Sequence, residues 1–314
     1  MNLRRAVPVL LFLGLALQAH AGPEQAASMA AEAFKADVGA ASFKLIPDLG
    51  RLGALGSEED QLVALLDDPS PEVRAAAAKS LNDYALSSYK AEKKLLEVVD
   101  RRDEEESVKR EAIKSLAWAA QHSNTRKKIL EVATDNRQTP TLRAISFKSL
   151  YVVSHEYDVR RAMQETVKDS REELAVREGA AWVLWSDSLN DSRSKNALLD
   201  VATDRDEPAS LRAEAVKSLY LAMQFRDVKD RIEDMARTEG LAESLRVPAV
   251  LCLHAVNQDW GIERLLKDLS QGSQSKAVRT AAVKAMSRGL NLELVRTFHL
   301  SHYMGRFIDP LEDQ

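Results

Sequence analysis

The chain has 314 residues, of which 45% are hydrophobic and 29% are charged, and it contains only 12 Gly and 9 Pro. A composition this rich in helix formers and this poor in turn residues argues against an all-β fold. The 44 Lys and Arg residues are outnumbered by 48 Asp and Glu, so the formal net charge is −4. A chain without a basic excess is a poor candidate for binding nucleic acid. Its single cysteine, Cys252, excludes an internal disulfide.

Residues 1–21 have the pattern of a secretory signal peptide. Arg4 and Arg5 precede an apolar run over residues 6–17, and residues 19–21 read Ala-His-Ala, a small-x-small cleavage site. The apolar run is shorter than the roughly 20 residues that a helix needs to cross a bilayer. We therefore expect an exported protein, periplasmic or secreted, without a membrane span.

A short motif recurs along the chain at intervals of 33 to 35 residues. It consists of Val or Leu followed by Arg or Lys, and its seven copies are Val73-Arg74, Val108-Lys109, Leu142-Arg143, Val176-Arg177, Leu211-Arg212, Leu245-Arg246 and Val278-Arg279. A fixed period in this range is typical of solenoids, in which each unit buries its apolar face against its neighbours.

Each unit contains two helical patterns. In the second, apolar residues follow the Val or Leu at offsets 0, 4, 5 and 8, which places them on one stripe of a helix, as in Leu211, Ala215, Val216 and Leu219. The first pattern lies about a dozen residues earlier, as in Leu62, Leu65 and Leu66, and acidic turns that contain proline separate the two. Residues 58–289 are therefore predicted to form about seven two-helix units.

The turn Asp68-Pro69 and the segment from there to Leu81 resemble the HEAT repeats most clearly, and the resemblance spans residues 58–289. It implies an all-α fold, an α-solenoid coiled as a right-handed superhelix. It also implies a row of hydrogen bonds from arginines to turn aspartates. The arginines at the matching positions are Arg74, Arg143, Arg177, Arg212, Arg246 and Arg279, and the candidate partners are Asp68, Asp103, Asp135, Asp169 and Asp204.

The segments that flank the array are expected to cap it. Residues 22–57 are interpreted as an N-terminal cap, in which Ser57 pairs with Asp60 to begin the first full helix. Residues 290–314 are predicted to form a final amphipathic helix and a tail that shield the last unit.

The sequence contains no signature of phosphate-binding loops, zinc proteases or serine hydrolases. Cys252 and His254 would point in different directions on one helix, so we expect a structural role for both. His299 and His302 could share a helix face near Asp309, but no complete set of metal ligands is evident. We therefore expect no catalytic residues, no metal and no cofactor.

The candidate partner-binding residues stand at offset 6 of the second helical pattern. Five units carry lysine there, and the other two carry Trp182 and Leu251; the lysines are Lys79, Lys114, Lys148, Lys217 and Lys284. In HEAT arrays the second helices line the concave face, so this row could hold an extended acidic peptide or protein. Alternatively it is a solvated face, since Glu111 and Glu214 lie three residues before two of the lysines.

The two tryptophans of the fourth unit extend this hypothesis. We expect Trp182 to be exposed and to anchor a partner, because Trp is frequent at binding hot spots. Trp185 is included as a candidate contact, with burial in the core at least as well supported.

The sequence thus favours an exported protein-protein interaction scaffold or adaptor without catalysis. Two alternatives stay open: an enzyme resembling the HEAT-like bilin lyases, and a regulator or inhibitor of an exported enzyme. The partner's identity and the oligomeric state do not follow from the residues.

Overall fold

The computed structural model describes residues 57–271 and 274–288 and the isolated residues 294 and 297. The predicted signal peptide, nearly all of the N-terminal cap, most of the C-terminal segment, and the residues His299, His302 and Asp309 lie outside these ranges. By its internal contacts the chain divides into two units, residues 1–77 and 78–314.

The described part of the first unit contains helix α4 (Glu58–Leu65) and most of α5 (Pro71–Ser80). The predicted capping pair is present, because the Ser57 hydroxyl accepts from the Asp60 N–H and the Asp60 carboxylate accepts from the Ser57 N–H. In the turn that follows α4, Arg74 donates to the carbonyls of Asp68 and Pro69 at 2.8 and 3.0 Å.

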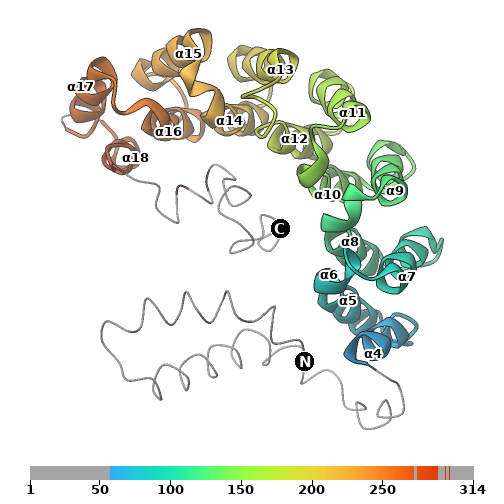
Figure 1. Ribbon diagram of the computed structural model, residues 1–314. Helices are drawn as coiled ribbons and strands as arrows, with labels where there is room; N and C mark the ends of the chain where they lie inside the picture. Colours follow the sequence, from blue (N-terminus) through green and yellow to red (C-terminus); the bar gives the residue numbers. More distant parts are fainter. Residues whose placement is uncertain (1–56, 272–273, 289–293, 295–296, 298–314) are drawn as a thin grey trace, which may run out of the picture. The chain divides into compact units, whose positions relative to one another are not determined.

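The second unit consists of alternating outer and inner helices (Figure 1). The outer layer comprises α7 (Tyr89–Asp100), α9 (Ser123–Thr134), α11 (Tyr157–Lys168), α13 (Ser192–Thr203), α15 (Arg226–Arg237) and α17 (Trp260–Leu269). The inner layer comprises α8 (Glu106–Ser115), α10 (Pro140–Ser149), α12 (Leu174–Val183), α14 (Ala209–Ser218), α16 (Glu243–Cys252) and α18 (Lys276–Ala285). The predicted α-solenoid of two-helix units is therefore confirmed.

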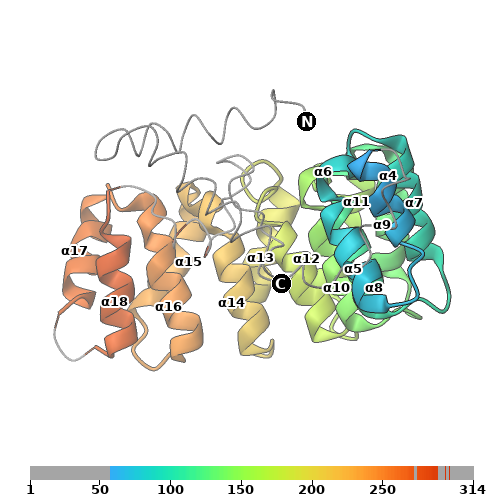
Figure 2. The same cartoon turned by 90° about the horizontal axis from the view of Figure 1, so that it is seen from below.

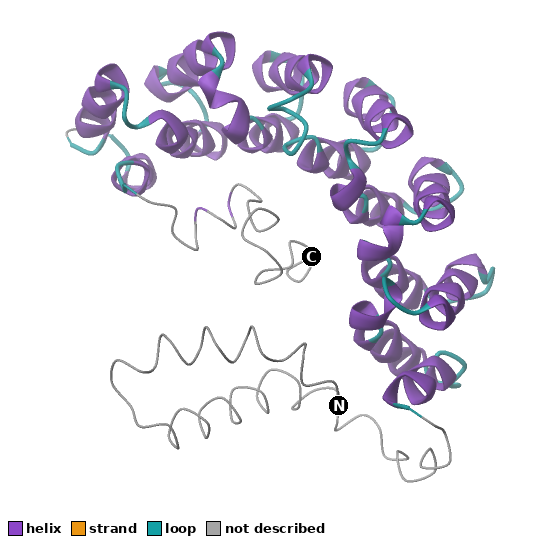
Figure 3. Cartoon of the chain, in the orientation of Figure 1, coloured by secondary structure: helices purple, strands orange, loops and turns teal. Residues whose placement is uncertain are grey.

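Short helical segments connect each two-helix repeat to the next, and the sequence pattern did not predict them. They are α6 (Asn82–Ala85) and the 3-10 helices η2 (Trp118–Gln121), η3 (Tyr151–Val153), η4 (Tyr220–Gln224) and η5 (Leu253–Val256). The part of the chain that the structure describes contains helices and loops but no strand (Figure 3).

The core lies between neighbouring helices of the second unit, which Figure 2 shows side-on. The predicted stripe is buried completely, since Leu211, Ala215, Val216 and Leu219 are all 0% exposed. The backbones of α10 and α12 approach closely at Gly179, where a Cβ atom would lie 2.8 Å from the carbonyl oxygen of Ala144. Because burial of this apolar surface supplies most of the stability, the folding of each two-helix repeat depends on its neighbours.

The arginine row is present, but its predicted partners are wrong in part. Arg143 donates to the carbonyl of Ala133 at 3.1 Å and forms a two-pronged ion pair with Glu172 of the next turn, one bond measuring 2.9 Å. Arg177 donates twice to the carbonyl of Val167 and makes one bond to Glu207 of the next turn. The acid that each of these arginines binds is thus a glutamate and not the expected aspartate.

The turn aspartates are used locally instead. Asp135 accepts from the backbone N–H and the guanidinium of Arg137, and Asp169 does so from Arg171. The neighbouring Arg137 guanidinium holds the pKa of the Asp135 carboxyl well below its usual range. Asp135 and Asp169 therefore use their carboxylates within their own turns.

Candidate functional site

The lysines at offset 6 lie near the C-terminal ends of the inner helices, on α8, α10, α14 and α18. Lys114 lies 3.4 Å from Glu111, and Lys217 lies 2.7 Å from Glu214, each carboxylate being one helical turn earlier. Both glutamates are the ones that the sequence places three residues before a lysine, where their charge offsets that of the lysine. This part of the inner layer therefore carries both positive and negative side chains and is not uniformly basic.

Lys148, on α10, lies at the centre of a cluster of charged side chains. Burial lowers its pKa, Glu214 and Glu178 act in the opposite direction, and Lys217 and Lys114 lower it further. The structure thus brings the lysines of α8, α10 and α14 within electrostatic range of one another. We call Lys114, Lys148, Lys217, Glu111, Glu178 and Glu214 the inner charge cluster.

The expectation that Trp182 is exposed is wrong. Its side chain is only 2% exposed, because the ring of Tyr151 meets it edge-on at 6.2 Å and the Lys148 ammonium lies 6.0 Å above it. Trp185 is 1% exposed and belongs to the core. A partner can therefore reach Lys148, which is half-buried, but not the face of either tryptophan.

Trp182 belongs to a series of ring contacts that crosses three units. Trp118 meets Tyr151 edge-on at 5.9 Å, and Tyr151 in turn meets Trp182. We call these three residues the aromatic ladder. Sequence reasoning missed it, although the recurrence of aromatic residues just after the inner helices was visible. Because these rings are packed against one another, the Trp182 ring beneath Lys148 is held in a fixed position.

The three remaining candidate residues lie apart from the cluster. Lys79 is exposed on α5, Leu251 is half-buried on α16, and Lys284 is half-buried on α18, four inner helices beyond Lys148. The structure therefore brings together three of the eight predicted contact residues as charged groups, with Trp182 below one of them, Lys148.

Cys252 and His254 bind different partners, as their spacing predicts. The Cys252 thiol donates to the carbonyl of Val216 at 3.2 Å, and burial raises the pKa of this thiol. The Nδ1 atom of His254 lies 2.6 Å from the hydroxyl of Tyr220, and the two rings stack. This arrangement contains a thiol kept in its unreactive form and no adjacent base.

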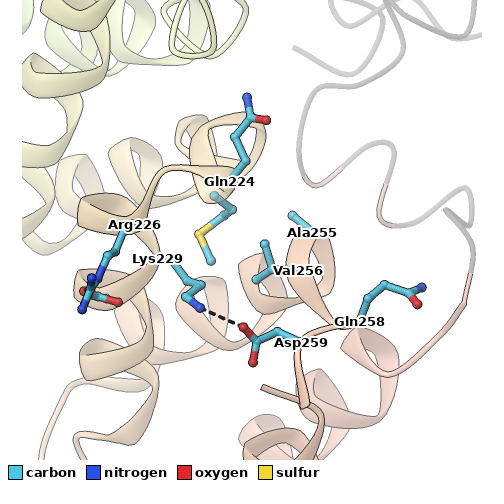
Figure 4. Close-up of a pocket in the computed structure, with 9 residues that line it drawn as sticks. Gln224, Arg226, Lys229, Ala255, Val256, Gln258 and Asp259 are labelled. Atoms are coloured by element: carbon cyan, nitrogen blue, oxygen red, sulfur yellow. Dashed lines mark hydrogen bonds and ion pairs between the residues drawn. The ribbon is translucent and has the colours of Figure 1, made fainter. Parts of the chain in front are cut away.

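A cavity of about 690 Å³ lies in the outer part of the second unit, between η4 with α15 and η5 with the turn before α17 (Figure 4). An ion pair of 2.9 Å between Lys229 and Asp259 spans it, and Arg226 pairs with Asp230 at 3.5 Å. Its remaining lining residues are Met223, Gln224, Ala255, Val256 and Gln258. The charged groups here neutralise one another, so the cavity presents no nucleophile with an activating base.

The described residues contain no group of three or more His, Cys, Asp or Glu side chains placed to hold a metal ion. Nor does any helix among them combine the length and the apolar character that crossing a membrane requires.

The chain has similarities to a known family and to solved structures. The family model for HEAT repeats matches residues 59–151. The YibA protein of Escherichia coli is 16% identical, with a TM-score of 0.44 and coverage of 80% of this chain and 98% of that one. Human deoxyhypusine hydroxylase, in complex with glycerol, is also 16% identical, with a TM-score of 0.34 and coverage of 80% and 88%. Among curated proteins nothing matches. The resemblance to HEAT repeats that the periodic sequence predicts is thus confirmed for residues 59–151.

Proposed function

We propose that the protein is an exported, non-catalytic scaffold that binds an extended protein or peptide segment along its inner layer. The observation that carries this proposal is the inner charge cluster, in which side chains from α8, α10, α12 and α14 converge around Lys148. A cluster shared by four helices of a solenoid offers several contacts to a segment that runs along the array.

The electrostatics of Lys148 support an acidic group on the partner. Burial and the two flanking lysines disfavour its charged form, while Glu214 and Glu178 favour it. A partner carboxylate next to Lys148 would stabilise the ammonium further. Because carboxylates already accompany the lysines, the surface favours a partner of matching charge pattern over any polyanion.

The experiment is affinity capture from the native envelope fraction with three forms of the chain. The first is the wild type, the second carries Lys148→Glu and Lys217→Glu, and the control carries Arg102→Glu and Arg205→Glu. The control changes the same charge at exposed turns on the opposite side of the helix pairs. We expect the wild type and the control to recover the same partner and the inner variant to lose it. Equal recovery by all three forms would contradict the proposal.

Export and the absence of catalysis need separate measurements. If the signal peptide is cleaved as proposed, the mature chain begins at Gly22, which N-terminal sequencing of the native protein would show; a mature chain that retains Met1 would contradict it. Incubation with candidate tetrapyrroles is expected to leave their absorbance spectra unchanged. A spectral change that grows with time would favour the lyase alternative and overturn the scaffold proposal.

A further inference from the structure

The N-terminal ends of the outer helices carry an excess of positive charge. We define the outer rim as the N-cap and the first six residues of α7, α9, α11, α13, α15 and α17. This rim contains fourteen Lys and Arg against eight Asp and Glu, a formal excess of six positive charges in a chain whose net charge is −4. Cations are unfavourable at helix N-termini, because the helix dipole is positive there. Stability of the helices therefore does not account for this pattern.

Seven of the eight acidic groups of the rim are engaged in ion pairs, most of which join successive units. Glu156 and Asp158 pair with Arg126, Asp191 with Arg160, Asp227 with Lys195, and Asp259 with Lys229, while Asp230 and Glu263 pair inside their own helices. The eighth, Glu92, lies 2.9 Å from the Nδ1 atom of His122 in the next unit. Several exposed cations make no ion pair within the described residues, namely Lys93, Lys127, Arg193 and Arg264. The rim therefore presents positive charge outward.

Three large aromatic side chains stand on the same rim, each at the first position of its helix. Tyr89 begins α7, Tyr157 begins α11 and Trp260 begins α17, and they are 79%, 65% and 75% exposed. Each has a cation one turn later: Lys93, Arg161 and Arg264 respectively. The Arg264 guanidinium lies 6.0 Å from the centre of the Trp260 ring.

The repeat geometry separates these aromatic residues too widely for a small ligand. They are two and three units apart, which at about 10 Å per packed helix corresponds to roughly 20 and 30 Å. The outer helices run side by side and are seen nearly end-on in Figure 1 and side-on in Figure 2, so their N-terminal ends face one side of the second unit. Groups spaced in this way can all contact an extended surface.

We propose that the outer rim binds an anionic lipid surface. Tyr and Trp side chains favour the membrane interface, where the ring enters the headgroup region and its polar atom stays hydrated. Lys and Arg are attracted to anionic headgroups, each adding to the affinity. The rim combines both kinds of side chain on one side of the array. The binding is peripheral and uses a surface separate from the inner charge cluster, so it does not depend on the proposed scaffold function.

The test measures co-sedimentation of the full chain with large vesicles at low ionic strength. One set of vesicles contains equal parts of phosphatidylglycerol and phosphatidylcholine, and the other contains phosphatidylcholine alone. We expect binding to the anionic vesicles, with a shift of tryptophan fluorescence to shorter wavelength, and at least about tenfold weaker binding to the neutral ones. Absence of binding to the anionic vesicles would overturn the proposal.

Two variants identify the surface, and the first of them has a control with an equal change of charge. The variant Lys93→Gln, Lys127→Gln, Arg193→Gln and Arg264→Gln removes four exposed rim cations, and its control removes four exposed cations at the opposite ends of the helices: Arg102→Gln, Arg137→Gln, Arg171→Gln and Arg205→Gln. The second variant is Tyr89→Ser, Tyr157→Ser and Trp260→Ser. Its serines are compatible with the fold, because Ser123 and Ser192 occupy the same position of α9 and α13.

Both rim variants are expected to bind anionic vesicles at least about tenfold more weakly, while the control binds like the wild type. Circular dichroism establishes that each variant is folded. An equal loss of vesicle binding by the control would show that charge attracts the protein to the vesicles without a defined surface. That result would overturn the proposal. So would full competition by soluble polyglutamate combined with unchanged binding of the serine variant, because that outcome indicates a soluble acidic partner.

Discussion

Arg177, on α12, donates to a carboxylate oxygen of Glu207 at 2.5 Å, although the two residues are thirty positions apart and belong to successive units. Both side chains are largely buried, at 4% and 14% exposure. The same guanidinium donates twice to the carbonyl of Val167 at the end of α11. One arginine thus connects an outer helix, an inner helix and the turn of the next unit.

Replacement of Arg177 by alanine is expected to destabilise the array strongly. It leaves the Glu207 carboxylate and the Val167 carbonyl partly buried without their donor, a loss of about 3–5 kcal/mol. Arg212→Ala is the matched control, because Arg212 makes a single bond of 3.3 Å to the carbonyl of Ala202 and no ion pair among the described residues. Its cost is expected to be about 1 kcal/mol. Urea unfolding of both variants checks the difference, and equal losses would contradict it.

The contact between α10 and α12 predicts how the addition of one methyl group at Gly179 changes the stability of the protein. A Cβ atom on Gly179 would lie 2.8 Å from the backbone oxygen of Ala144, which cannot rotate away. Gly179→Ala is therefore expected to cost about 1–3 kcal/mol. Nothing lies within 4 Å of the corresponding atom on Gly240, so Gly240→Ala serves as the control and is expected to be neutral or slightly stabilising. A neutral Gly179→Ala in thermal unfolding would refute this reading of the interface.

Asp187, in the turn after α12, predicts a dependence of stability on pH. Burial raises the pKa of its carboxyl, while the hydrogen bond from Ser154 and the charges of Arg160 and His155 act in the opposite direction and Asp191 adds to the rise. Since the pKa is higher in the folded than in the unfolded state, stability falls as the pH rises from the unfolded pKa through the folded one.

The variant Asp187→Asn should remove this dependence. We expect it to be more stable than the wild type near neutral pH, by on the order of 1 kcal/mol, and to match it at acid pH where both side chains are neutral. Thermal unfolding across this range measures the difference between the two proteins. An advantage for the wild type at neutral pH would show that the ionised carboxylate is well accommodated.

The sequence was sufficient for the fold because a solenoid repeats its burial pattern. Offsets 0, 4, 5 and 8 define a stripe that only neighbouring helices can cover, and residues such as Leu211 and Val216 are buried as expected. The period also placed Lys114, Lys148 and Lys217 on one side of the inner layer.

The details that the sequence did not predict depend on the reach of side chains between units. Asp169 accepts from Arg171 in its own turn, whereas Glu172 accepts from Arg143 of the preceding unit. Trp182 lies at a position that is lysine in other units, and it is buried because Tyr151 of the preceding unit covers it. Such contacts join residues about one period apart, and a helical wheel of one unit does not contain them.

Site-specific photo-crosslinking tests the central claim most directly, namely that a partner binds along the inner layer. A photoreactive residue is introduced at Leu251, half-buried on inner helix α16, and in a separate protein at Asn196, exposed on outer helix α13. After irradiation in the native envelope, we expect a discrete crosslinked species from position 251 and none from position 196. The same species from position 196, with none from position 251, would contradict it.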